Sequence, residues 1–272
     1  MSSSFHFISG LPRSGSTLIG AILRQNPAFS ASITSPVALL CGALQQKMSG
    51  NTEFATFFDD ARRASLLRGV FGSYYANLGD NRVVFDTNRT WTGKIPLLAS
   101  LFPSARIICC VRDIGWIIDS IERILAQNPL QLSRIFNYAP GMSVYARAEM
   151  LMNADTGLIG QAWSTLREAW FGDSAQRLIV IPYDNLVQEP ARVLRQLYEE
   201  LHEPPFQHDF DRVVYDEPEF DVQLGMPGLH RVEGKVAARP RLPSIPPDLF
   251  AKYAEAGFWR RSELNARGVK IL

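Results

Sequence analysis

Short apolar runs alternate with longer amphipathic stretches along the first 200 residues of the chain. Ile107 to Val111 are apolar at successive positions, which is typical of a strand buried on both faces. The apolar runs predict strands at 5–9, 82–86, 106–111 and 178–181. The stretches between them predict a helix from about residue 17 and helices over 37–48, 53–78, 94–101, 116–126, within 143–171 and over 190–202, with 30–36 as a polar loop or short strand. This alternation predicts an α/β fold with a parallel sheet flanked by helices on both faces.

The last part of the chain follows a different pattern. Residues 206–272 are rich in proline and read as irregular until a helix near 247–259. Neither an internal repeat nor a low-complexity linker divides the chain. We therefore expect a single domain over 1–272, with 206–272 as an irregular C-terminal lid or tail.

Composition narrows the class of protein. The chain has 272 residues, of which 46% are hydrophobic, and a net charge of +1. This balance gives no general electrostatic reason to bind nucleic acid or a membrane. No apolar run approaches the ~20 residues that a bilayer span needs, and 5–9 is too short for a signal peptide. We expect a cytoplasmic protein. Its three cysteines, two of them adjacent in a predicted strand, are not spaced to bind zinc, so no metal site is predicted.

The segment Gly10-Leu-Pro-Arg-Ser-Gly-Ser-Thr17 joins the first predicted strand to the first helix. Its spacing, Gly-x4-Gly-x-Ser/Thr, is that of a phosphate loop, in which consecutive N–H groups and a helix N-terminus cradle an anion. Ser16 replaces the lysine that usually precedes the last residue, and the cation of the loop is Arg13. The missing lysine argues against Mg²⁺-dependent ATP or GTP chemistry, although Asp86 loosely fits the metal-binding aspartate of that class.

Polar clusters follow each predicted strand of the sheet. They are Arg13, residues 86–89, Arg112-Asp113 and Tyr183-Asp184. Because ligands of such sheets bind outside the carboxyl ends of the strands, these clusters are expected to line one crevice.

The loop Pro12-Arg-Ser-Gly-Ser-Thr17 closely resembles the 5′-phosphosulfate loop of sulfotransferases that use 3′-phosphoadenosine 5′-phosphosulfate (PAPS). The resemblance implies the P-loop-like sulfotransferase fold, without a metal. It places Arg13 at the bridging oxygen and the sulfuryl group. The 5′-phosphate would be held by the backbone amides of Ser14, Gly15, Ser16 and Thr17.

A second segment resembles the same family independently. Residues 110–120 match its 3′-phosphate motif, in which an arginine ends a strand and a serine follows eight residues later on a helix. Arg112 and Ser120 would converge on one phosphate, supplying charge and a hydroxyl. The alternative is that Arg112 pairs with Asp113 or Asp119 at the surface.

Three weaker matches extend the proposed nucleotide site. Tyr183 leads a turn that resembles the family's nucleotide-contacting tyrosine, although helix capping also explains it. The segment 228–235 resembles the basic loop that closes over the nucleotide, and its candidate ligands are His230, Arg231 and Lys235. A solvated basic loop is the alternative. Arg123 is a further candidate for the 3′-phosphate, or else lies on a solvated helix face.

The stretches 10–18 and 101–106 look most like tyrosylprotein sulfotransferases, including bacterial ones, and the resemblance covers most of 5–200. Those enzymes place a glutamate base shortly after the first helix, but 30–36 contains no carboxylate. A phenol of pKa about 10 must lose its proton during transfer. We take Asp86 as the candidate base with Arg89 as an added cation; a cap or an Asp86–Arg89 ion pair is the alternative. His230 is a weaker candidate for the base.

The sequence thus predicts a PAPS-dependent sulfotransferase whose acceptor is a tyrosine of a peptide or protein. The same reaction on a carbohydrate, lipid or secondary metabolite, that is, on a small hydroxyl compound, is the alternative. A third alternative is a nucleotide-binding protein without turnover, because the glutamate is missing. A second copy of the chain, in a homodimer, is a candidate partner.

Overall fold

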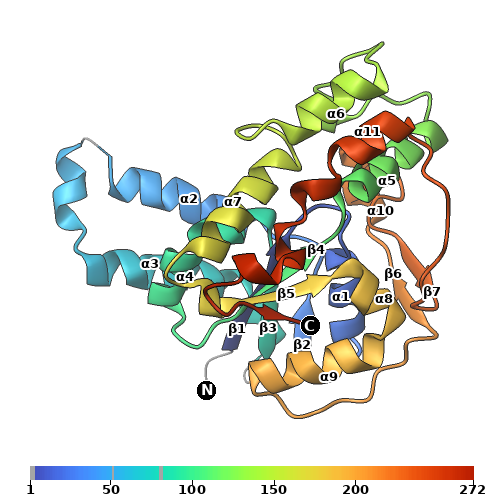
Figure 1. Ribbon diagram of the computed structural model, residues 1–272. Helices are drawn as coiled ribbons and strands as arrows, with labels where there is room; N and C mark the ends of the chain where they lie inside the picture. The colour runs from blue at the N-terminus through green and yellow to red at the C-terminus, as the bar shows by residue number, and fades with distance from the viewer. Residues whose placement is uncertain (1–3, 51, 80–81) are drawn as a thin grey trace.

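A parallel sheet forms the centre of the molecule. The structure, a computed structural model, describes residues 4–50, 52–79 and 82–272. Six strands lie in the order β2-β3-β1-β4-β5-β8 (Figure 1). Their bounds are β1 Ser4–Gly10, β2 Phe29–Ala31, β3 Val83–Thr87, β4 Ile107–Val111, β5 Leu178–Pro182 and β8 Lys270–Ile271. Because β1 pairs with β3 on one side and β4 on the other, the chain changes direction across the sheet at β1. This switch point is where ligands of such sheets bind.

Helices cover both faces of the sheet, which confirms the predicted α/β class. Phe7 of β1 belongs to one buried core and its neighbour Ile8 to the other, as alternation along a strand requires. The first core is closed by α2 Val37–Met48, α3 Asp60–Tyr74, α4 Ile95–Leu101, α5 Ile114–Gln127, α6 Val144–Met152 and α7 Gly160–Phe171. The second is closed by α1 Ser16–Leu23, α8 Tyr183–Gln188 and α9 Pro190–Leu201.

The prediction of one continuous helix over 53–78 was wrong. A 3-10 turn at Glu53–Phe57 comes first, and Phe58 is extended. The side chain of Asp59 then caps α3 by accepting a hydrogen bond from the Arg62 backbone N–H at 2.7 Å. An aspartate that satisfies a free N–H group favours the start of a new helix over continuation of an old one.

The tail is more ordered than its composition predicts. It holds α10 Pro218–Gln223 and α11 Pro247–Lys252, while β6 Val213–Tyr215 and β7 Val232–Gly234 form a small antiparallel sheet. The chain ends beside β5 (Figure 1), where β8 adds a parallel edge strand. Val269 and Leu272 each join one of the two cores. The tail therefore packs into the same cores as the first 200 residues.

The structure also bears on the membrane and cysteine expectations drawn from composition. In the described part of the chain no helix is long and apolar enough to cross a bilayer. Cys41, Cys109 and Cys110 are free and buried, and burial raises the pKa of each thiol.

Candidate active site

The loop after β1 is fixed by a close approach to β4. Gly10 has φ +103°, and a Cβ at this position would lie 2.3 Å from the carbonyl oxygen of Cys110. The same carbonyl accepts a hydrogen bond from the backbone N–H of Leu11 at 2.8 Å. Only glycine fits here, because both the backbone angle and the contact exclude a side chain.

The loop then presents the uncapped end of α1. Gly15, at φ +98°, stands at the helix N-cap, and no side chain caps the first turn. The N–H groups that begin a helix have no partner within it, so they are free to bind an anion. Ser14 is fully buried, and its hydroxyl donates to the Pro12 carbonyl at 3.1 Å. The Ser14 side chain thus shapes the loop, and Ser14, although predicted as a nucleotide ligand, is not on the wall of the cavity that the loop lines.

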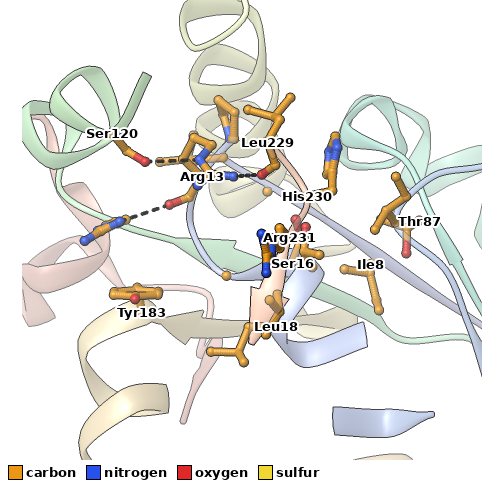
Figure 2. Close-up of a pocket in the computed structure, with 18 of the residues that line it drawn as sticks. Ile8, Arg13, Ser16, Leu18, Thr87, Ser120, Tyr183, Leu229, His230 and Arg231 are labelled. Atoms are coloured by element: carbon orange, nitrogen blue, oxygen red, sulfur yellow. Dashed lines mark hydrogen bonds between the residues drawn. The ribbon is translucent and has the colours of Figure 1, made fainter. Parts of the chain in front are cut away.

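Arg13 turns from the loop toward α5 and the tail (Figure 2). It has φ +55°, which is uncommon for a residue other than glycine. Its Nε donates to Ser120 Oγ at 3.1 Å, and its guanidinium also donates to the Leu229 carbonyl. Burial, followed by the nearby charge of Arg112, lowers the pKa of Arg13 to about 10. The side chain remains a cation at neutral pH.

Arg112 follows β4 and faces the same loop. It donates to the carbonyl oxygen of Arg13 at 3.3 Å, and its guanidinium lies 4.0 Å from the ring centroid of Tyr183. Its Nε is buried without a hydrogen-bond partner in the described chain. A buried N–H group of this kind is costly unless a ligand accepts from it. Its predicted surface partner Asp113 instead caps α5 and pairs with Arg260 at 3.2 Å.

These groups surround one cavity of about 500 Å³ at the carboxyl ends of β1, β3 and β4. Of the predicted nucleotide ligands, the cavity is lined by Arg13, Gly15, Ser16, Thr17, Arg112, Ser120, Tyr183, His230, Arg231 and Lys235. Arg89, which was predicted as an added cation beside the base, also lines it. The structure therefore brings together residues from both halves of the chain, from Gly10 to the tail.

The tail residues on the cavity wall differ in how they are held. Arg231 pairs with Glu233, and Lys235 pairs with Asp211 at 2.9 Å, in both cases between exposed side chains. Such pairs are weak, so both cations can exchange their partner for a bound anion. His230 is held more firmly, because its Nδ1 lies 2.5 Å from the Oδ1 of buried Asp221.

The structure does not bring Asp86 to the cavity. Its carboxylate is fully buried and accepts hydrogen bonds from Ser35 Oγ, Tyr75 Oη and Trp91 Nε1, each at 2.7 Å. Burial raises its pKa, and the three donors oppose that rise. Neither predicted alternative is found in the described chain, since Asp86 neither caps a helix nor pairs with Arg89. Through these hydrogen bonds Asp86 connects three segments of the fold. Because its carboxylate is enclosed in this way, the prediction that Asp86 is the base was wrong.

Arg123 is also absent from the cavity wall. Its Nε donates to Asp119 Oδ2 at 3.0 Å, and its guanidinium reaches the Leu242 carbonyl at 2.6 Å. Arg241 lies 3.0 Å from the same buried carboxylate and does line the cavity. Arg241 was not predicted from the sequence, because its position depends on the fold of the proline-rich tail.

The comparisons with known proteins agree with the fold. The model of the sulfotransferase family matches residues 6–208, and the chain belongs to this family. A solved sulfotransferase from Alicyclobacillus acidocaldarius is 14% identical, with a TM-score of 0.50 over 82% of this chain and 90% of that one. This likeness extends to the fold alone.

Two further structures are similar at lower scores. The sulfotransferase domain of the Synechococcus PCC 7002 olefin synthase is 18% identical, with a TM-score of 0.49 over 93% of this chain and 94% of that one. The sulfotransferase domain from the curacin biosynthetic pathway is 19% identical, with a TM-score of 0.49 over 76% of each chain. No curated protein matches the chain.

Proposed function

We propose that the chain transfers the sulfuryl group of PAPS to an acceptor hydroxyl. One observation carries this proposal: Arg13, Arg112 and the uncapped N-terminus of α1 converge on a single cavity at the switch point of the sheet. Cations and N–H donors fixed before the reaction stabilise charge that develops on a transferring group and its leaving oxygen. A sulfuryl group carries less charge than a phosphoryl group, so these groups suffice for the transfer.

The residues fit a nucleotide with two anionic ends. The amides at 15–17 and the guanidinium of Arg13 would hold the sulfated 5′ end. Arg112, whose buried Nε lacks an acceptor, and the Ser120 hydroxyl would hold the 3′-phosphate. Tyr183 stacks on Arg112 and orients its guanidinium. Arg231 and Lys235 would close over the nucleotide from the tail.

We propose a phenolic hydroxyl as the acceptor, with a peptide or protein tyrosine as the first choice. The segments 10–18 and 101–106 support tyrosine through their resemblance to tyrosylprotein sulfotransferases. A smaller cavity of about 290 Å³ adjoins the first and shares Ile33, Thr34 and Phe220 with it. Its aromatic walls, which include Tyr74 and Phe85, suit a ring better than a sugar.

Glu217 is the carboxylate on the wall of this smaller cavity. It would repel acidic residues beside an acceptor tyrosine. We therefore expect neutral or basic tyrosine peptides to react faster than acidic ones. A small phenol or other secondary metabolite remains the second candidate, because a cavity of this size also holds a free ring.

Labelled PAPS incubated with the protein and an acceptor panel tests the proposal. The panel contains acidic, neutral and basic tyrosine peptides, small phenols and glycans. Label should appear on phenolic acceptors and be lost in Arg13→Ala. Binding of adenosine 3′,5′-bisphosphate without any sulfated product would favour a non-catalytic nucleotide-binding protein instead. Magnesium-dependent uptake of ATP would favour a phosphotransferase.

A further inference from the structure

His230 and Asp221 form a pair at the wall of the cavity that the roles assigned above do not use. His230 Nδ1 lies 2.5 Å from Asp221 Oδ1, and the backbone N–H of His230 donates to Asp221 Oδ2 at 2.8 Å. Both carboxylate oxygens are therefore held by one residue. Asp221 is fully buried in α10, whereas His230 lines the cavity. The arrangement fixes both the position and the orientation of the imidazole ring.

The pair also sets which ring nitrogen is free. Nδ1 must carry a proton to donate to the carboxylate, so Nε2 of the neutral ring has a lone pair. No partner of Nε2 is found among residues 4–50, 52–79 and 82–272. The ring is further positioned by Phe220, whose centroid lies 5.5 Å away in an edge-to-face contact. A histidine oriented in this way is equipped to accept a proton from a bound group.

The pair lies beside the cation proposed to stabilise the transfer. The carbonyl of Leu229, the residue before His230, accepts a hydrogen bond from Arg13. One short tail segment thus contacts the catalytic arginine and carries the imidazole. Figure 2 shows Arg13, Leu229 and His230 among the residues that line the cavity.

Burial, together with two nearby cations, favours the neutral form of His230. Burial lowers the pKa of its imidazole, Asp221 raises it, and the cations Arg13 and Arg89 lower it, so that the net direction is downward. Asp221 is contributed by α10, Arg13 by the loop after β1 and Arg89 by the segment after β3. On the tail itself, Arg231 is paired with Glu233. A neutral ring at pH 7 is the form that can remove a proton.

We propose that His230 is the general base that takes the proton of the acceptor hydroxyl, and that Asp221 is its positioning residue. This proposal rests on the proposed sulfotransferase function. As the acceptor oxygen bonds to sulfur, the bond from sulfur to the bridging phosphate oxygen breaks, and its electrons leave with adenosine 3′,5′-bisphosphate. The acceptor proton passes to Nε2 of His230 and then to solvent. The base thus comes from the tail rather than from the segment after the first helix.

The other carboxylates near the cavity are less suited to this role. Asp86 is buried and accepts three hydrogen bonds. Glu217 accepts from the hydroxyl of Tyr215 at 2.7 Å, and Glu233 is an exposed partner of Arg231. None of them combines a place on the wall of the larger cavity with an orientation fixed by a buried group, as His230 does.

His230→Asn tests the proposal, because its amide Nδ2 can replace Nδ1 toward Asp221 while Nε2 is lost. With PAPS and a phenol of pKa about 10, kcat should fall about 10²–10⁴-fold. With a phenol that is already ionised at the assay pH, the loss should be much smaller. Affinity for adenosine 3′,5′-bisphosphate should stay within a few-fold of wild type. His202→Asn, at the exposed histidine that follows the last residue of α9 and lies outside the cavity wall, should match wild type in both assays.

Asp221→Asn tests whether Asp221 positions the imidazole of His230 or only packs against it. Activity requires neutral His230, so kcat/KM falls as the pH drops through the pKa of its imidazole. Removal of the Asp221 charge lowers that pKa, and the acidic limb should move to lower pH while kcat falls on the order of 10-fold or more. If Asp221 only contributed to packing, the acidic limb of the pH profile would stay at the same pH in Asp221→Asn.

Two measurements keep the inference distinct from the proposed function. ¹⁵N NMR of labelled histidine reports the tautomer without any acceptor, and a proton on Nε2 rather than Nδ1 would overturn the inference. Equal turnover of His230→Asn and wild type on an un-ionised phenol would also overturn it, while leaving the sulfotransferase proposal intact. Failure of wild type to bind adenosine 3′,5′-bisphosphate would instead contradict the proposed function itself.

Discussion

Arg13 Nε donates a hydrogen bond to Ser120 Oγ at 3.1 Å, although the two residues are 107 positions apart in the chain. The first belongs to the loop proposed for the sulfated end of the nucleotide, and the second to the helix proposed for its 3′-phosphate. The contact links the two anion sites through one side chain. Changes at either residue are therefore expected to affect the other site.

Arg13→Ala should lower kcat by about 10²–10³-fold, because it removes a cation positioned against the charge that develops during transfer. Steady-state kinetics with saturating PAPS measures the effect. Arg195→Ala, an exposed arginine on α9, serves as the matched control. Arg13→Ala with wild-type turnover would refute the role given to this guanidinium.

Ser120→Ala should weaken binding of adenosine 3′,5′-bisphosphate by about 1–2 kcal/mol, the value of one hydroxyl bound to a charged group. Isothermal calorimetry measures this loss. Ser100→Ala removes an exposed hydroxyl on α4 and should leave affinity unchanged. An unaltered affinity in Ser120→Ala would remove the hydroxyl from the nucleotide site.

Tyr183 is expected to act through its ring rather than its hydroxyl. The Arg112 guanidinium lies over that ring at 4.0 Å. Tyr183→Phe should retain nucleotide affinity, whereas Tyr183→Leu should lose about 0.5–2 kcal/mol of binding with the loss of cation–π stacking. If the two variants bind alike in calorimetry, the stacking does not orient Arg112.

Asp86→Asn should destabilise the fold and spare the chemistry. The amide replaces an acceptor oxygen with a donor facing one of Ser35, Tyr75 and Trp91, all of which are donors to Asp86. We expect a loss of about 2–4 kcal/mol in the free energy of unfolding, measured with urea. The kcat of the folded variant should remain near wild type. A large fall in kcat without loss of stability would restore Asp86 as the base.

His6 should make stability depend on pH. Its Nδ1 accepts a hydrogen bond from the Arg106 backbone N–H at 3.1 Å, and burial, together with Arg106, lowers its pKa to about 4. The unfolded chain binds the proton near pH 6.5. The contribution of neutral His6 to the free energy of unfolding is therefore complete above pH 6.5. It falls by about 3 kcal/mol as the pH drops toward 4.

Urea titrations between pH 7.5 and 4.5 measure this loss. His6→Asn keeps an acceptor but cannot be protonated, so its stability should change less over the same range. An unchanged pH slope in the variant would assign the effect to other groups, including His208 and His230, whose pKa values are also lowered.

The central strands and the phosphate loop could be predicted because their signals are local. A buried parallel strand such as Ile107–Val111 is apolar at successive positions, and the glycines of the loop are required by its backbone. The short strands β6, β7 and β8 gave no such signal. Two or three residues are too few for alternation, and only their partners define them.

The incorrect predictions about the candidate site have a related cause. Asp86 ends an apolar run, as a catalytic carboxylate would, but its three donors come from segments that only the fold brings together. The partner of His230, Asp221, precedes it by nine residues in a tail without periodic pattern. Only contacts formed in the folded chain show that Asp86 is enclosed and that Asp221 holds His230.

Calorimetric titration with adenosine 3′,5′-bisphosphate tests the central claim most directly. We expect one binding site per chain without added metal, with affinity strongly reduced in Arg112→Ala. No heat of binding from this nucleotide, together with tight uptake of ATP and Mg²⁺, would contradict it.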